Sequence, residues 1–97
     1  MTRLKMISSI NAMLSQSGNI GLTAHFVDAD DETMDDEIEV RMAGVSISVS
    51  MQVGANYYGV GRLSYTNGEI DGVEHLYVGA SFKAAAARLI AEVAKSR

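Results

Sequence analysis

The residues with the most chemical potential in this chain are carboxylates, and most of them stand in one short stretch. Eight of the twelve acidic residues lie between positions 28 and 39, namely Asp28, Asp30, Asp31, Glu32, Asp35, Asp36, Glu37 and Glu39. Calcium takes oxygen ligands at alternate positions of a twelve-residue loop, and carboxylates occupy positions 1, 3, 5, 9 and 12 of this stretch. Thr33 stands at position 6, however, where the sharp turn needs glycine. We therefore predict no metal site, and a solvated charged loop over residues 28–36 is the simplest interpretation.

The same stretch can also serve as an interaction surface. The net charge is −4, yet the chain outside residues 28–39 has eight basic and four acidic residues. Carboxylates spaced along a loop and a strand present the negative field that a nucleic-acid-binding protein meets on phosphates. We therefore expect the eight carboxylates to form a contact surface for a basic protein partner.

A second candidate lies near the C-terminus, where a lysine-bearing, alanine-rich segment follows small residues. The segment runs Gly79-Ala80-Ser81-Phe82-Lys83-Ala84-Ala85-Ala86-Ala87-Arg88-Leu89. Over about residues 57–95 the chain resembles double-stranded-RNA-binding domains, in which a lysine at the position of Lys83 contacts phosphate. The resemblance implies nucleic-acid binding through Lys83 and Arg88. Phe82 at the neighbouring position, a missing Pro-His loop and the negative net charge depart from that family, so this stays an alternative.

No other residues complete a catalytic or nucleotide-binding motif. The run Gly59-Val60-Gly61-Arg62-Leu63-Ser64 stops short of G-x-G-x-x-G and leads into a strand pattern, where a phosphate site needs a helix. His25 and His75 are isolated, without a serine nucleophile elbow or an H-E-x-x-H motif. The chain has no cysteine, which excludes disulfides and thiolate metal sites. We expect neither cofactor nor enzymatic activity.

The elements that position these residues include a helix near each end of the chain. Thr2 and Gly18 are suited to begin and end a helix over residues 3–16, and Ser81 is suited to begin one over residues 82–95. Each predicted helix has one apolar stripe, formed by Met6, Ile7, Ile10, Met13 and Leu14 in the first and by Phe82, Ala86, Leu89, Ile90 and Val93 in the second.

Alternation of apolar and polar residues predicts strands between the helices, at 20–27, 38–42, 45–53, 57–65 and 73–78, with turns at Asn67-Gly68 and Asp71-Gly72. A two-residue hairpin at Ala43-Gly44 would pair Met42 with Val45, Val40 with Ile47 and Ile38 with Val49. A three-residue hairpin at 54–56 would pair Val53 with Tyr57, Ile47 with Leu63 and Val45 with Tyr65. The second register would also place Gly59 and Gly61 opposite Met51 and Val49.

These elements predict one α+β domain over residues 1–97, a two-layer sandwich with both helices on one face of an antiparallel sheet of four or five strands. The opposite face would carry Ser46, Ser48, Ser50, Gln52, Tyr58, Arg62 and Ser64. Tyr58 and Arg62 on that face are expected to contact a partner, since tyrosine and arginine favour interface hot spots.

The composition as a whole favours a binding protein. No apolar run near the N-terminus is long enough for a signal peptide or a membrane span, so we expect a cytoplasmic protein. In size, charge and lack of motifs the chain resembles small phage-encoded inhibitors such as anti-CRISPR proteins. The resemblance implies an inhibitor whose acidic stretch docks on a nucleic-acid-handling complex. The alternatives are the nucleic-acid-binding domain above and a homo-oligomeric accessory or structural protein, such as a homodimer, that associates through the polar sheet face or an edge strand.

Overall fold

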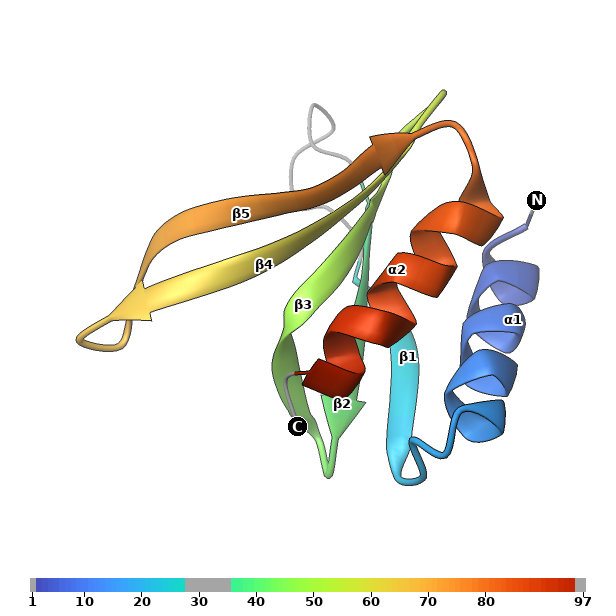
Figure 1. Cartoon of the computed structure of the whole chain (residues 1–97), viewed down its shortest axis with the longest axis horizontal. Coiled ribbons are helices and arrows are strands. Elements are labelled where there is room, and N and C mark those ends of the chain that lie inside the picture. The colour runs from blue at the N-terminus through green and yellow to red at the C-terminus, as the bar shows by residue number, and fades with distance from the viewer. Residues whose placement is uncertain (1, 28–35, 96–97) are drawn as a thin grey trace.

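The computed structural model describes residues 2–27 and 36–95 of the chain. The described part is an α+β sandwich of two helices and a five-stranded antiparallel sheet, whose strands are neighbours in chain order. Both helices cover the same face of the sheet (Figure 1), which confirms the predicted fold class. The elements are α1 (Arg3–Gln16), β1 (Leu22–Val27), β2 (Asp36–Met42), β3 (Val45–Val53), β4 (Tyr58–Thr66), β5 (Glu69–Gly79) and α2 (Phe82–Lys95).

Both helices have the predicted bounds because their caps are encoded locally. The Thr2 hydroxyl accepts a hydrogen bond from the Lys5 amide at 3.2 Å, and the Ser81 hydroxyl accepts one from the Ala84 amide at 3.1 Å. Each bond satisfies an amide that has no partner within its own helix. Gly18 has a φ of +80°, the left-handed conformation that terminates α1 at little cost.

The hydrophobic core lies between the helix layer and the sheet. Burying each large aliphatic side chain stabilises the fold by about 1.5–3 kcal/mol. The core side chains are Met6, Ile10 and Leu14 of α1, Ala85, Ala86, Leu89, Ile90 and Val93 of α2, and Leu22, Ala24, Ile38, Val40, Val49, Met51 and Val60 of the sheet.

The β2–β3 hairpin turns where predicted, but its register changes along the strands. Ala43 and Gly44 both have positive φ, as a two-residue hairpin turn requires, and Met42 pairs with Val45. A bulge between Glu39 and Arg41 then shifts the register by two residues. The predicted pairs of Val40 with Ile47 and Ile38 with Val49 are therefore wrong: Ile38 pairs with Met51. A two-residue shift leaves the apolar face unchanged, because side chains alternate with a period of two.

The connection from β3 to β4 is one residue longer than predicted. The Gly54 amide donates to the Tyr57 carbonyl at 2.9 Å, and Val53 pairs with Tyr58 instead of Tyr57. A one-residue shift moves every side chain of β4 to the other face of the sheet. Tyr58, Arg62 and Ser64 consequently lie on the helix side, and Gly59 and Gly61 oppose Gln52 and Ser50 instead of Met51 and Val49.

Strands β3 and β4 separate before they end. Their pairing runs only from Val53–Tyr58 to Val49–Arg62, so the predicted pairs of Ile47 with Leu63 and Val45 with Tyr65 do not form. Strands β4 and β5 stay paired up to the turn at Asn67-Gly68, and this part of the hairpin projects from the sandwich (Figure 1). We call residues 63–73, which form this projecting end of the hairpin, the arm. The predicted turn at Asp71-Gly72 is wrong, because both residues lie within β5.

Candidate functional site

The arm carries several exposed apolar side chains, and its two faces differ in chemistry. Leu63 pairs with Val73 and Tyr65 pairs with Ile70. Tyr65 is 51% exposed, Ile70 60% and Val73 49%. These four side chains form a patch on the face directed away from the helices, since Leu63 follows Arg62, which contacts α2. Val73 Cγ1 also lies 3.3 Å from where a Cβ would stand on Gly61, another residue of that open face.

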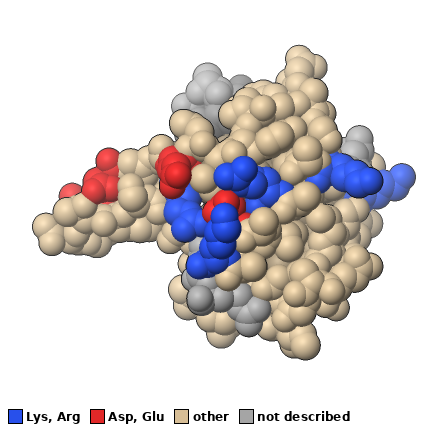
Figure 2. All heavy atoms as spheres, viewed as in Figure 1, with Lys and Arg blue, Asp and Glu red and all other residues tan. Residues whose placement is uncertain are grey.

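The opposite face of the arm is acidic. The arm contains Glu69 and Asp71 of β5, Glu74 follows directly after it, and the strand has no lysine or arginine. Glu74 pairs in register with Arg62, which places it on the helix side. The Thr66 hydroxyl donates to the Asp71 carboxylate, and the pKa of Asp71 is lowered by hydrogen bonds from Thr66 and Ser64. In the view from the helix side, acidic side chains gather on the arm (Figure 2).

The predicted acidic surface is only partly described. Asp28, Asp30, Asp31, Glu32 and Asp35 lie outside the described residues, so their contact role stays a prediction. Asp36 forms an ion pair with Arg3 of α1, and Glu39 forms one with Arg41 of the same strand. Glu37 pairs in register with Gln52. Within residues 2–27 and 36–95 no group of three or more metal-ligating side chains comes together.

Tyr58 and Arg62 lie under helix α2, so their predicted position on the open face is wrong. The rings of Tyr58 and Phe82 meet edge to face, with centroids 5.6 Å apart. Arg62 Nη2 donates to Glu92 Oε2 at 2.6 Å. Both residues therefore join β4 to α2 within the domain, and neither presents a hot spot on the open face.

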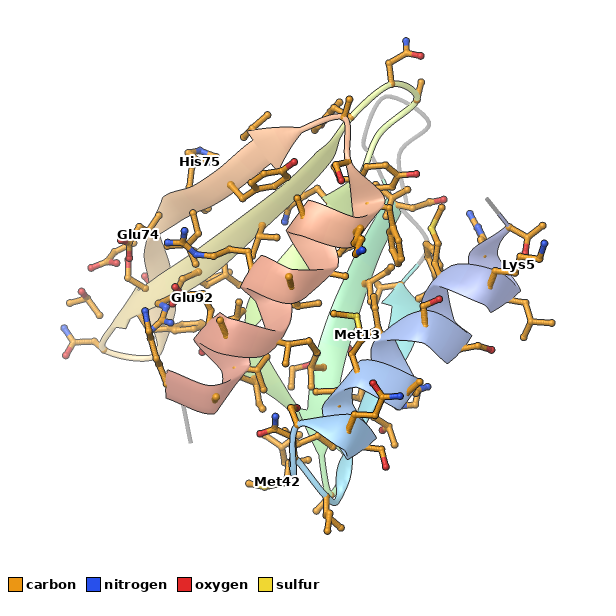
Figure 3. All side chains as sticks on the ribbon, turned by 45° about the vertical axis from the view of Figure 1, so that its right-hand side comes forward. Lys5, Met13, Met42, Glu74, His75 and Glu92 are labelled. Atoms are coloured by element: carbon orange, nitrogen blue, oxygen red, sulfur yellow. The ribbon has the colours of Figure 1, made fainter. Side chains whose placement is uncertain are left out.

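Glu92 is the centre of a charged cluster that sequence analysis missed. The residue is only 4% exposed, and Arg88 Nε and Lys95 Nζ lie 3.1 Å and 3.4 Å from its Oε1. Burial raises the pKa of Glu92. Hydrogen bonds and charges from Lys95 and Arg88 together lower it by more than burial raises it, so the net shift of the pKa is downward. Figure 3 shows Glu92 on the side of α2 that faces β4 and β5. The i,i+4 spacing of Arg88 and Glu92 is visible in the sequence, whereas the approach of Arg62 depends on the register of β4.

The helix layer presents the opposite charge to the arm. Lys and Arg side chains form a band across the helices in Figure 2. The helices contain Arg3, Lys5, Lys83, Arg88 and Lys95 against a single carboxylate, that of Glu92. Lys83 and Arg88, the predicted phosphate contacts, are both exposed. Of these two, Arg88 is already engaged in the Glu92 cluster.

A hollow lies where β3 and β4 separate. Its volume is about 490 Å³, and it is lined by Met42, Val45, Ser46, Ile47, Ser48, Arg62 and Leu63. The lining is mixed, with apolar side chains beside serine hydroxyls and one guanidinium, and no pattern of charge along it identifies an occupant.

Comparison with protein-family models, with curated proteins and with solved structures finds no match to this chain. Neither described helix has the length and apolar content needed to cross a membrane.

Proposed function

We propose that this chain is a non-enzymatic protein-binding domain that docks its partner on the arm. The observation that carries the proposal is the patch of Leu63, Tyr65, Ile70 and Val73, built from two cross-strand pairs on a projecting hairpin. A two-stranded hairpin has little stability of its own in water, and contiguous exposed apolar side chains typically mark an interaction site. A partner that covers the patch would remove these side chains from water and order the arm.

The charges of the chain support a basic partner. Glu69 and Asp71 of the arm and the adjoining Glu74 place three carboxylates on the helix side of β5, and eight more stand between positions 28 and 39. Complementary charge raises the rate at which two proteins associate and disfavours partners whose surface has the same sign of charge. A narrower form of the proposal, an inhibitor of a nucleic-acid-handling complex as in anti-CRISPR proteins, is supported by this charge pattern and by the small size of the chain.

A pull-down with matched variants tests the proposal. The tagged protein would be compared with the double variant Ile70→Ser, Val73→Ser and with the control Ile20→Ser, since Ile20 is 82% exposed but lies before β1. All samples would be treated with nuclease. We expect the same protein to be recovered with the wild type and the control and to be lost with the arm variant. Equal recovery with all three would overturn the proposal.

A second candidate function, nucleic-acid binding on the helix layer, is favoured by one observation. The exposed cations of α1 and α2 lie in one band on the same face (Figure 2). Phosphate contacts make binding fall steeply with salt. Under this candidate, Lys83→Ala would weaken binding to double-stranded RNA or DNA, whereas Arg41→Ala on β2 would not. Lys83 is the more informative position, because Arg88→Ala also disturbs Glu92.

A further inference from the structure

We propose that the outer edge of β5 accepts an extended segment of the partner as an added strand, and that basic and apolar residues alternate in that segment. The inference rests on the proposed function and specifies the chemistry of the partner. Strand β5 is last in the sheet order, so one edge of it pairs with β4 and the other pairs with no described strand. Such an edge offers a row of backbone donors and acceptors to another chain.

The outer edge of β5 is open to an added strand, but only over a short stretch. Strand β5 spans Glu69–Gly79 and contains neither proline nor lysine, two residues that commonly block edges. Register shifts between Val60 and Gly61 and between Ser64 and Tyr65 leave extra residues in β5, at Leu76 and Asp71. The straight part of the edge is therefore residues 72–75. An added strand would pair chiefly there, and the bulges would limit longer edge-to-edge pairing.

The side chains along β5 identify the kind of segment. Glu74 is exposed on the helix side, and within the described residues no ion pair engages it or Glu69. Val73 and Ile70 are exposed on the open side. Residues directly opposite on neighbouring strands share a face, so an added strand would place alternate residues beside the carboxylates and beside the patch. Lysine or arginine on one side and apolar residues on the other would complement both.

The same charges disfavour a second copy of this chain at the edge. Antiparallel pairing of β5 with β5 would bring together the carboxylates of Glu69, Asp71 and Glu74 from both copies, and β5 has no lysine or arginine to offset them. Like charges on neighbouring strands are destabilising. A partner strand that carries basic residues meets no such repulsion.

A peptide titration tests the inference. The probe is a short blocked peptide of alternating lysine and valine. It is compared with a peptide that has glutamate for lysine and with one whose alternate backbone amides are N-methylated. Binding to isotopically labelled protein would be followed by amide NMR. We expect shifts along residues 69–79, binding at least about tenfold weaker for the glutamate peptide, and loss of binding for the N-methylated one.

Charge-reversal variants complete the test. Glu74→Lys is expected to weaken binding of the lysine peptide and to strengthen binding of the glutamate peptide. The control Gln16→Lys on α1 is expected to change the binding of neither peptide. Equal binding of the N-methylated peptide, shifts confined to the helices, or a peptide-free dimer with shifted β5 amides would each overturn the inference. If the pull-down partner is lost with Ile70→Ser, Val73→Ser but the peptide does not bind to β5, the inference fails and the proposed function stands. If the partner is retained by that variant, the proposed function fails.

Discussion

Arg62 of β4 and Glu92 of α2 form an ion pair across the two layers of the sandwich, with Arg62 Nη2 2.6 Å from Glu92 Oε2. The pair lies next to the point where β3 and β4 separate, since Val49–Arg62 is the last pair between those strands. Arg62 Nε is buried and has no hydrogen-bond partner within the part of the chain that the structure describes, so the guanidinium is not fully satisfied. We infer that this link holds the base of the arm against the helix layer while the arm itself remains exposed.

Removing the Glu92 carboxylate is expected to destabilise the domain. In Glu92→Gln, the cations of Arg62, Arg88 and Lys95 would lose their shared counter-charge. Breaking one side of a buried pair is costly because the remaining charges are left uncompensated. Urea unfolding should show a lower midpoint for Glu92→Gln than for the wild type, and Glu74→Gln serves as the exposed control. An unchanged midpoint for Glu92→Gln would contradict the structural role of the cluster.

The same residue predicts a pH dependence of stability. The folded-state pKa of Glu92 is lowered, so its contribution is complete above the unfolded-state pKa, near pH 4.3, and is lost as the pH falls through the folded-state pKa. The difference in unfolding free energy between wild type and Glu92→Gln should therefore narrow below about pH 4.3. Asp71, whose pKa is also lowered, is present in both proteins. Parallel stability profiles across the acid range would show that Glu92 does not have the lowered pKa.

The position of the core predicts which apolar truncations matter. Met51 is fully buried, so Met51→Ala should lower the unfolding free energy by roughly 2–5 kcal/mol. Val78 is 66% exposed, and Val78→Ala should stay within about 0.5 kcal/mol of the wild type. Thermal or urea unfolding of the two variants measures both values. Similar losses would mean that the sheet faces are assigned wrongly.

The helices and one hairpin turn could be predicted from sequence because their signals are local. Thr2, Gly18 and Ser81 set helix boundaries through their own hydrogen bonds and backbone conformation. The turn at Ala43-Gly44 likewise follows from two adjacent residues. None of these features depends on contacts that are distant in the chain.

The register of β4 could not be predicted from the sequence, and the positions of the predicted contact residues Tyr58 and Arg62 depend on it. Two tyrosines follow the loop, and either Tyr57 or Tyr58 could pair with Val53 on local pattern alone. Tertiary packing decides the outcome by placing Val60 in the core beside Met51. This register of β4 places Arg62 under α2 and leaves the patch on the arm exposed. The separation of β3 from β4 has no local signal, so the arm could not be predicted, and Tyr65 on it is half exposed.

The acidic stretch provides a further prediction about the partner. Neutralising Asp30, Asp31, Asp35 and Asp36 to asparagine should weaken binding of a basic partner without unfolding the domain. The Asp36–Arg3 pair is a surface ion pair whose loss costs at most about 1 kcal/mol. Affinity and melting temperature would be measured on the same variant. Unchanged affinity would remove the acidic stretch from the interface and leave the arm as the docking surface.

Site-specific photo-cross-linking tests the central claim most directly. A photoreactive residue would be placed at position 70 on the arm, at position 83 on the helix layer and at position 20 as an exposed control, and lysates would be treated with nuclease. Docking on the arm predicts a covalent protein adduct from position 70 and none from positions 20 and 83. An adduct from position 83 without one from position 70 would contradict the account and direct attention to the basic helix layer.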